Sequence, residues 1–275
     1  MEITRENKKV RHILSLSGGK DSSALAVFLG NQIPELEYVF CDTGEELDET
    51  YEYLQKLEAY LGKQINRLNP DRPFSHYLQI YNGVLPDART RWCTRNLKIK
   101  PFERYVGTDE CFSYIGIRAD ELHRKGYISS KSNIHPRYPF IENGITKTDV
   151  IRILDTSGLG FPKYYDWRSR SGCYFCFFQQ RIEWVGLLEN HPQKFNDAME
   201  YEKMDEKSGE RFSWSSNESL QELMQPDRIN QIKDEYLKRK TRLETKHKPN
   251  EPLMNIFIEQ NFDDVDDSSC LICHL

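Results

Sequence analysis

The chain has 275 residues, enough for one large domain with an appendage and for a sizeable buried core. Hydrophobic residues make up 38% of it, its mean hydropathy is −0.72, and it contains no run of the roughly 20 apolar residues that a membrane helix needs. The polar, charged start does not resemble a secretory signal, so we expect a cytoplasmic protein without membrane contact. The net charge of −5 argues against a generally basic nucleic-acid binder, although it leaves room for a local basic patch.

The first 117 residues alternate short apolar runs with helical patterns. Apolar runs bounded by turn residues indicate buried strands, and periodic apolar positions indicate amphipathic helices. Strands that alternate with helices predict an α/β fold, in which an open parallel sheet carries helices on both faces. The expected strands are 12–17, 36–42, 64–70 and 111–117, and the expected helices between them are 22–30 and 49–61.

The remainder of the chain has a different character. Residues 118–145 are polar and indicate loops, whereas 160–176 carry Pro, Gly and aromatic residues around a cysteine pair. Helices are expected over 146–158, ended by Gly158, over 183–204 with a break near Pro192, and over the highly charged 217–248. We therefore predict a first domain over 1–160 and a cysteine-containing, mainly helical region over 161–275.

The sharpest motif is SGGKDS, residues 17–22, which lies between the first predicted strand and the first predicted helix. Anions bind at helix N-termini because backbone N–H groups point outward there. Two glycines let the backbone approach phosphate oxygens, and the spacing is not that of the Walker loop. The alternative is an ordinary glycine turn with a helix cap. The residues predicted to bind a nucleotide here are Ser15, Ser17, Gly18, Gly19, Lys20, Asp21 and Ser22.

SGGKDS resembles the PP-loop of the adenine-nucleotide alpha-hydrolase superfamily, which includes ATP pyrophosphatases, tRNA thiolation enzymes and sulfonucleotide reductases. Three later segments are similar to the phosphoadenosine phosphosulfate reductase branch. The resemblance spans roughly residues 12–185, and the order and spacing of its motifs are more specific than any one of them. The three segments are CDTG at 41–44 with ET at 49–50, GIRADE at 116–121, and YPF at 138–140 with TDV at 148–150.

The resemblance implies an adenine nucleotide, ATP with Mg²⁺, at the carboxyl ends of the strands. It places Asp42 and Thr43 near the ribose, the adenine or the Mg²⁺, and Gly116 and Arg118 near an anionic group. Two structural alternatives stay open: Asp42 as a strand-end cap, and Arg118 as the partner of Glu121 in an ion pair. The catalytic candidates are Lys20, Asp21, Arg118 and, from the tail, Cys273.

The seven cysteines divide by position. Cys41 and Cys111 stand in apolar runs and are predicted to be core residues. Cys93 and the pair Cys173 and Cys176 resemble the segments that hold a [4Fe–4S] cluster in iron–sulfur-containing adenylyl-sulfate reductases. The separation of 173 − 93 = 80 residues fits that pattern. Where those enzymes carry a second, adjacent cysteine this chain has Thr94, so one ligand of the four is missing.

The missing ligand leaves several interpretations open. Cys270 or Cys273 can fold back and supply the fourth thiolate, or one iron stays open and carries a sulfide. Alternatively, two C-x-x-C pairs, the second being Cys270 and Cys273, hold a structural Zn²⁺. In a third interpretation Cys273 is a nucleophile like the tail cysteine of sulfonucleotide reductases, although the surrounding Glu-Cys-Gly-Leu context of that tail is absent.

Two basic stretches suggest nucleic-acid contacts. Residues 89–104 carry six Lys and Arg residues around Cys93, and 238–248 (KRKTRLETKHK) form a second cluster that is otherwise a solvated helix face. The leading hypothesis is an ATP pyrophosphatase that adenylates an acceptor oxygen, after which sulfur from a cysteine desulfurase displaces AMP. It resembles the ATP-pyrophosphatase subunit of DNA phosphorothioation systems, with DNA favoured over tRNA as the acceptor. The alternatives are a sulfonucleotide reductase using thioredoxin, and a nucleotide-binding subunit of a defence complex; because this branch is often dimeric, a homodimer is also expected.

Overall fold

The computed structural model describes residues 10–121, 124, 129–204, 211–215 and 218–244. These residues form two compact units. The first unit consists of the described residues up to Pro73 and of those within Cys93–Lys163. The second consists of Phe74–Trp92 and of the described residues from Tyr164 onward. The boundary between Lys163 and Tyr164 lies close to the predicted division at residue 160. The second unit also contains Phe74–Trp92, which the prediction places in the first domain.

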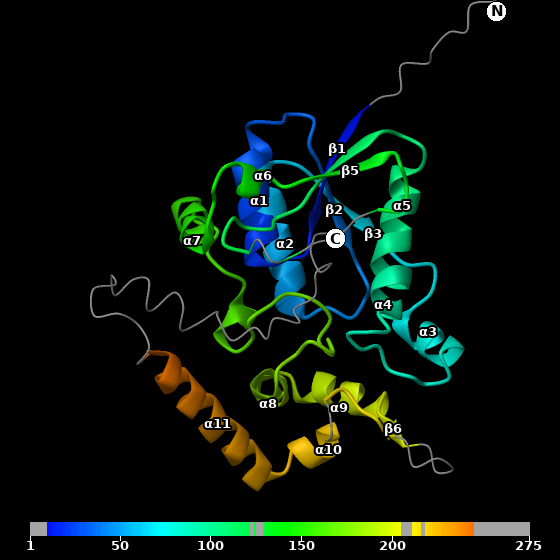
Figure 1. Ribbon diagram of the computed structural model, residues 1–275, viewed down its shortest axis with the longest axis vertical. Coiled ribbons are helices and arrows are strands. Elements are labelled where there is room, and N and C mark those ends of the chain that lie inside the picture. The colour runs from blue at the N-terminus through cyan, green and yellow to red at the C-terminus, as the bar shows by residue number, and fades with distance from the viewer. Residues whose placement is uncertain (1–9, 122–123, 125–128, 205–210, 216–217, 245–275) are drawn as a thin grey trace, which may run out of the picture. The chain divides into compact units, whose positions relative to one another are not determined.

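The first unit is built on a sheet of five parallel strands in the order β3-β2-β1-β4-β5 (Figure 1). The central strand β1 pairs with β2 on one side and with β4 on the other. This arrangement confirms the predicted open parallel sheet. The strands are β1 (Arg11–Leu16), β2 (Glu37–Cys41), β3 (Ile65–Leu68), β4 (Cys111–Tyr114) and β5 (Ile134–Arg137).

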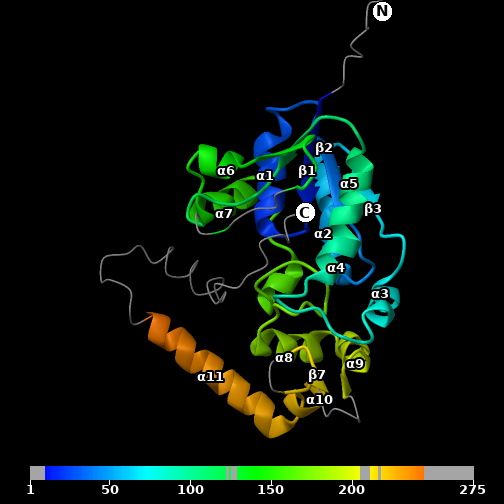
Figure 2. The same ribbon diagram turned by 45° about the vertical axis from the view of Figure 1, so that its right-hand side comes forward.

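Helices cover both faces of this sheet, as Figures 1 and 2 show. Successive side chains of a strand point to opposite faces. Accordingly, Leu14 and Leu16 of β1 belong to the core cluster shared with α1, α2 and α7, whereas Ile13 belongs to the cluster shared with α5. The helices of this unit are α1 (Lys20–Gly30), α2 (Asp48–Leu61), α5 (Lys100–Val106), α6 (Pro139–Glu142) and α7 (Lys147–Thr156), with the π-helix η1 (Arg95–Ile99) before α5.

Local sequence signals set the ends of two of these helices. Thr146 and Asp149 form a capping box at the start of α7, in which Asp149 accepts hydrogen bonds from the backbone N–H and the hydroxyl of Thr146. Helix α2 ends where Gly62 adopts the left-handed conformation, with φ of +61°. Gly158 likewise has a φ of +73°, just past the end of α7. The helices predicted over 49–61 and 146–158 are therefore confirmed.

Strand β5 corrects the prediction that 118–145 is loop-rich throughout. Ile134 is buried and pairs with Cys111 of β4, but the other residues of the strand are polar or Pro136. Because β5 is the last strand in the sheet, one side of it needs no partner, and proline lacks the N–H that a central strand would require. A strand of four residues with one buried apolar side chain gives too weak a pattern to be recognised from the sequence.

The second unit is mainly helical. The ring of Phe175 packs in its core against two other rings: it is tilted against Phe74, with centroids 4.4 Å apart, and stacked on Trp214, with centroids 5.0 Å apart. The break predicted near Pro192 is the junction between two helices, the second of which begins at that proline. The elements are α3 (Phe74–Ile80), α8 (Arg181–Asn190), α9 (Pro192–Glu200), α10 (Leu220–Leu223), α11 (Pro226–Glu244) and the antiparallel pair β6 (Lys203–Met204) and β7 (Arg211–Phe212); the short α4 (Trp92–Thr94) and η2 (Lys163–Asp166) lie at the unit boundaries.

Candidate functional site

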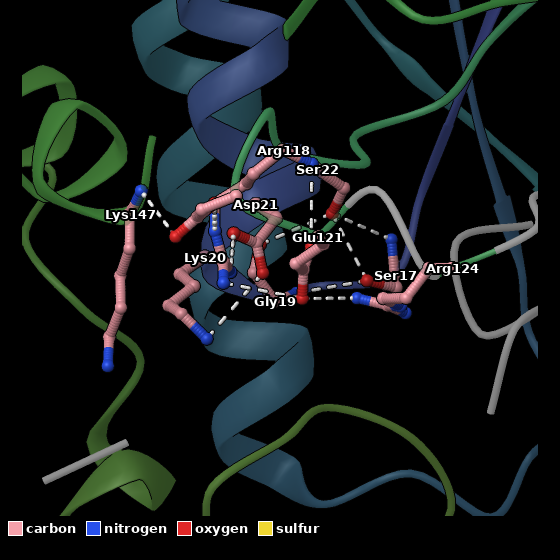
Figure 3. A network of polar contacts seen from close by, with 10 residues as sticks. Ser17, Gly19, Lys20, Asp21, Ser22, Arg118, Glu121, Arg124 and Lys147 are labelled. Carbon is pink, nitrogen blue, oxygen red and sulfur yellow. Dashed lines mark hydrogen bonds and ion pairs between the residues drawn. The ribbon is translucent and has the colours of Figure 1, made fainter. Parts of the chain in front are cut away.

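The glycine-rich motif forms a tight turn between β1 and α1 (Figure 3). The hydroxyl of Ser22 accepts a hydrogen bond from the backbone N–H of Ser17 at 3.1 Å and donates one to the carbonyl oxygen of Gly19 at 3.2 Å. Gly19 is the N-cap of α1, and no side chain caps the helix there. The motif therefore folds back on itself at the N-terminus of a helix, which is where backbone geometry favours an anion.

Two glycines permit close packing around this turn. Gly18 has a φ of +72°, and a Cβ at this position would lie 2.6 Å from Cγ2 of Thr50 on α2. Gly116, just after β4, approaches the first turn of α1 so closely that a Cβ there would lie 3.2 Å from the carbonyl carbon and oxygen of Asp21. Any larger residue at either position would push the loop away from its neighbours.

Charged side chains gather around Asp21 in the first turn of α1 (Figure 3). Arg118 donates from Nη1 to Oδ1 of Asp21 at 2.9 Å and from Nε to Asp120 at 2.9 Å, and its Nη2 lies 3.3 Å from Glu121. The Lys20 ammonium lies 3.5 Å from Oδ2 of Asp21. Lys20, Asp21 and Arg118 are each more than nine-tenths buried. Two predicted site cations therefore converge on one carboxylate beside the turn, although Arg118 follows a different strand, β4.

Burial alone would lower the pKa of Arg118, but the surrounding carboxylates of Asp21, Glu121 and Asp120 more than offset this and raise its pKa. Arg118 thus stays positively charged in a setting with little water. The ion pair between Arg118 and Glu121, which is the structural alternative to a binding role for this arginine, is present together with the contact to Asp21. It does not exclude a binding role, because an incoming phosphate can replace a carboxylate as the partner of a guanidinium.

Sequence reasoning missed two further basic residues beside this cluster, Lys147 and Arg124. Lys147 is 7% exposed and its backbone N–H donates to Asp120 at 3.4 Å, while Arg124 pairs with Glu121 at 2.7 Å. Lys147 stands directly before the TDV segment, which was the only signal for it. No pattern around Arg124 distinguishes it from the other basic residues of its polar stretch.

The end of β2 forms a second part of the site. Oδ1 of Asp42 accepts hydrogen bonds from the backbone N–H of Gly44 at 3.0 Å and from the Tyr51 hydroxyl at 2.8 Å, and Oδ2 lies 3.8 Å from Arg67. These residues and Thr43 are among those that line a surface pocket. Because β1 and β2 pair in parallel, with Leu16 beside Phe40, this pocket follows the strand next to the glycine-rich turn.

Glu46, another residue that sequence reasoning missed, holds Thr43 in place. Its carboxyl group accepts a hydrogen bond from the Thr43 hydroxyl at 2.8 Å and one from the Thr43 backbone N–H at 3.2 Å. Burial raises the pKa of Glu46, which is 2% exposed. Ser15, in contrast, lies inside β1 rather than at its end, is 2% exposed, and its hydroxyl has no partner among the described residues.

The cysteines fall into two classes. Cys41 and Cys111 are buried, as predicted, and burial raises the pKa of each to about 12. Cys93, Cys173 and Cys176 are half-exposed. Cys93 belongs to the first unit, whereas Cys173 and Cys176 occupy one turn of the second unit, where the backbone N–H of Cys176 donates to the carbonyl oxygen of Cys173 at 3.1 Å.

The thiols of the described residues do not by themselves complete a metal site. Nowhere in the described part of the chain do three or more His, Cys, Asp or Glu side chains gather in a group that could hold a metal ion. A [4Fe–4S] cluster or a Zn²⁺ site needs about four protein ligands, and one C-x-x-C turn supplies two. Cys270 and Cys273, expected as a fourth ligand and a nucleophile, lie outside the described residues.

The basic stretch 89–104 is divided between the two units at Cys93. In the first unit Arg104 pairs with Asp71, and Lys100 donates to Asn96. In the second unit Arg91 lies over the ring of Phe178. The described part of the later cluster, up to residue 244, is the end of α11, and most of it is exposed. None of the described helices is both long enough and apolar enough to span a membrane.

The chain is similar in sequence to several known proteins. The chain is 26% identical over 226 residues to an uncharacterized protein of Methanocaldococcus jannaschii, covering 78% of this chain and 51% of that protein. It is 30% identical over 128 residues to the tRNA-specific 2-thiouridylase MnmA of Actinobacillus pleuropneumoniae, covering 42% of this chain and 33% of that enzyme. The chain spans about half the length of two Methanocaldococcus jannaschii proteins, which it matches over 78% and 70% of its own length.

Among solved structures, the phosphoadenylyl-sulfate reductase of Candida auris in its phosphate complex is similar at a TM-score of 0.48 and 13% identity, covering 60% of this chain and 82% of that one. The family model for the phosphoadenosine phosphosulfate reductase domain matches residues 11–176, which is more than half of the chain and includes both the glycine-rich turn and the C-x-x-C turn. The chain therefore belongs to the phosphoadenosine phosphosulfate reductase domain family.

Proposed function

We propose that the chain is a PP-loop ATP pyrophosphatase that adenylates an acceptor oxygen so that sulfur can be inserted, and that the acceptor is a phosphate oxygen of DNA, as in DNA phosphorothioation. The observation that carries the proposal is the convergence of buried Lys20 and Arg118 on the glycine-rich start of α1. A buried, positively charged site at a helix N-terminus suits a polyphosphate better than a neutral ligand.

In the proposed reaction the acceptor oxygen attacks the α-phosphorus of ATP. The bond from that phosphorus to the oxygen bridging to the β-phosphate breaks, and pyrophosphate leaves with the electron pair. Backbone N–H groups at the start of α1 and the Lys20 ammonium hold phosphate oxygens, while Arg118 stabilises the charge that develops on the α-phosphate. Both cations are paired with Asp21 beforehand, so they are already oriented before the nucleotide binds.

Mg²⁺ is the metal that this chemistry implies, and the residues present fit it. Mg²⁺ is usually held by one or two carboxylates together with substrate phosphates, so it does not need a cluster of three protein ligands. Asp21 at the start of α1 and Asp42 at the end of β2 would supply such carboxylate oxygens. When bound, the ion would neutralise charge on the leaving pyrophosphate.

The sulfur step uses a donor outside this chain. In the proposal a cysteine desulfurase transfers its sulfur to one thiol of this chain as a persulfide, and the outer sulfur of that persulfide displaces AMP from the adenylated acceptor. A second thiol then cleaves the S–S bond, which releases the phosphorothioate and leaves a disulfide that an added thiol reductant reopens. The half-exposed Cys173 and Cys176 are the thiols of the second unit that could take part. Because the described residues of neither unit supply four thiolates, no step is assigned to an iron–sulfur cluster or to Zn²⁺.

Two considerations support a nucleic acid as the acceptor. The thiouridylase to which this chain is similar is named as a tRNA-modifying enzyme, and the stretch 89–104 is strongly basic although the whole chain carries a net charge of −5. DNA is favoured over tRNA because the segment RSGCYFC at 170–176 resembles the corresponding segment of the phosphorothioation subunit.

The test is the fate of ATP labelled at its α- or γ-phosphate, incubated with the full chain, Mg²⁺, DNA and a desulfurase with cysteine. The expected products are AMP and pyrophosphate, formed only when DNA is present. Arg118→Lys should abolish most of this turnover, because lysine cannot make the three separate contacts of the guanidinium. Arg152→Lys, on the exposed face of α7, is the matched control and should behave like wild type. Formation of ADP and phosphate would overturn the proposal.

The family match itself favours a second candidate, reduction of a sulfonucleotide to sulfite with Cys273 as the nucleophile and thioredoxin as the reductant. Sulfite release from adenylyl sulfate or its 3′-phosphate, lost in Cys273→Ser, would identify this activity. A chain that binds ATP but gives neither sulfite nor pyrophosphate would instead be a nucleotide-binding subunit.

A further inference from the structure

Two arginines of the second unit lie against the same aromatic ring. The guanidinium carbon of Arg91 is 5.0 Å from the ring centroid of Phe178, and that of Arg170 is 5.5 Å from it. Cation–π attraction at these distances restricts a guanidinium to an orientation over the ring. All three side chains are half-buried, so they form part of the accessible surface. Arg91, Arg170 and Phe178 are called the Arg–Phe surface below.

No carboxylate neutralises these two arginines within the described part of the chain. Arg91 donates from Nε to the Ala88 carbonyl oxygen at 3.1 Å, and Nε of Arg170 is buried without a hydrogen-bond partner in that part. Arg118 in the first unit, by comparison, contacts three carboxylates. Two oriented guanidinium groups without a counter-charge form a site for an anion with several oxygens, such as a phosphate.

The Arg–Phe surface borders the C-x-x-C turn of the same unit. Arg170 stands three residues before Cys173, and Phe178 stands two residues after Cys176. Arg168 fixes the turn between them: it is 2% exposed and donates to the carbonyl oxygens of Gly172 at 3.2 Å and of Cys173 at 2.7 Å. An anion bound by Arg170 would therefore lie at the start of the segment that carries the two thiols.

The residue after Phe178 adds an independent observation. Gln179 is 8% exposed, and neither polar atom of its side-chain amide has a partner among the described residues. A buried amide without partners is costly, and native proteins keep few of them. This amide stands one residue after Phe178, so the same stretch of chain carries a second polar group that a ligand could pair.

We propose that the Arg–Phe surface binds a phosphodiester of the nucleic-acid acceptor and so brings the strand to the thiols of Cys173 and Cys176. This inference rests on the proposed function, because it takes the acceptor to be a nucleic acid. Guanidinium groups bind phosphate through two parallel N–H···O bonds, and aromatic rings beside them stack on unpaired bases. Phe177, whose ring centroid is 4.3 Å from that of Phe178, extends the aromatic part of the surface.

The experiment measures binding of the full chain to dye-labelled oligonucleotides by fluorescence anisotropy, without ATP. Single-stranded DNA, the corresponding duplex and single-stranded RNA are compared over a range of salt concentrations. Arg91→Gln and Arg170→Gln should each weaken binding several-fold. Each should also lower the slope of log K against log salt by about 0.7 for a single strand or about 0.9 for a duplex, as expected for one lost phosphate contact. Arg152→Gln, which removes an exposed arginine from the first unit, should change neither quantity.

Phe178→Leu tests the aromatic part, since it keeps an apolar side chain but removes the ring that orients both arginines. It should weaken single-strand binding about tenfold, whereas Tyr60→Leu, at an aromatic residue that is 48% exposed on α2, should not. Binding by the two arginine variants that matches Arg152→Gln in affinity and salt slope would overturn the inference.

The two proposals can fail separately. If wild type forms AMP and pyrophosphate but the arginine variants bind oligonucleotides normally, the Arg–Phe surface is refuted and the nucleotide chemistry stands. If the variants lose oligonucleotide binding while wild type never cleaves ATP between its α- and β-phosphates, the proposed function is refuted and the surface stands.

Discussion

Replacing Gly18 by alanine should destabilise the first unit more than the same replacement at a glycine of that unit where a Cβ would meet no atom within 4 Å. Two effects add at this position. The φ of +72° is unfavourable for an L-residue by about 1–2 kcal/mol, and the new Cβ would lie 2.6 Å from Cγ2 of Thr50. Thr50 is 1% exposed, so it cannot turn into solvent, and overpacking of a buried site costs about 1–3 kcal/mol. The expected loss in the free energy of unfolding is therefore about 2–5 kcal/mol.

Gly144 supplies the matched control, because its φ is +64° and no atom lies within 4 Å of the position that a Cβ would take there. Gly144→Ala should therefore show the backbone cost alone, about 1–2 kcal/mol. Thr50→Ser removes Cγ2, so the double variant of Gly18→Ala with Thr50→Ser should recover the steric part. A double-mutant cycle gives this coupling directly.

Urea denaturation followed by far-UV circular dichroism measures these differences. Tryptophan fluorescence would not, because all four tryptophans belong to the second unit. A steric clash with Thr50 is excluded if Gly18→Ala costs no more than Gly144→Ala, or if Thr50→Ser fails to restore any stability to the Gly18→Ala protein.

Three further outcomes are expected. Arg118→Met should lower the free energy of unfolding by about 3–5 kcal/mol, since it leaves the buried carboxylate of Asp21 without its cation. Urea denaturation measures this difference. A free energy of unfolding within about 1 kcal/mol of wild type, roughly the error of such a comparison, would contradict the ion-pair description. Hydrogen bonds from the α7 cap lower the pKa of Asp149, so its stabilisation is present above its unfolded pKa and is lost as pH falls through the lower folded value. Asp149→Ala should thus lower the free energy of unfolding by about 0.5–2 kcal/mol at pH 7. Urea denaturation at a series of pH values should show that this difference from wild type vanishes in strong acid. Iodoacetamide at pH 8 should label half-exposed Cys173 but leave Cys41 and Cys111 unmodified until the protein is unfolded, because burial raises the pKa of both thiols to about 12. Peptide mass mapping identifies the labelled cysteines. Fast labelling of Cys41 or Cys111 in the native protein would contradict their burial.

Much of the first unit was predictable because its signals are local. The run before residue 17 is apolar and short, the glycines follow at once, and the helix after them begins without a gap, so strand, turn and helix could be assigned together. The same holds for α7, whose capping box and closing glycine stand within one segment. Strand β5 could not be found in this way, because an edge strand with one buried side chain lacks the alternation on which such assignments depend.

The candidate site was only partly predictable, because several of its contacts join residues that no local pattern connects. Arg118 and Asp21 stand 97 residues apart and meet at 2.9 Å. Lys147 and Glu46 are buried site residues without a sequence signal of their own, since a lysine or glutamate in a polar stretch usually faces solvent. The pairing of Arg91 and Arg170 on Phe178 is hidden for the same reason.

The sequence by itself therefore determined the first four strands and the helices α1, α2 and α7 between or after them, the glycine-rich turn between β1 and α1, and the burial of Cys41 and Cys111. Each of these follows from the propensity and periodicity of neighbouring residues. Only the tertiary structure decided which distant side chains surround the turn. The strand order β3-β2-β1-β4-β5 places the ends of β2 and β4 on either side of β1, and so brings Asp42 and Arg118 to the two flanks of the same loop. That placement depends on which strands pair across the sheet, a non-local choice that the spacing of residues along the chain does not specify.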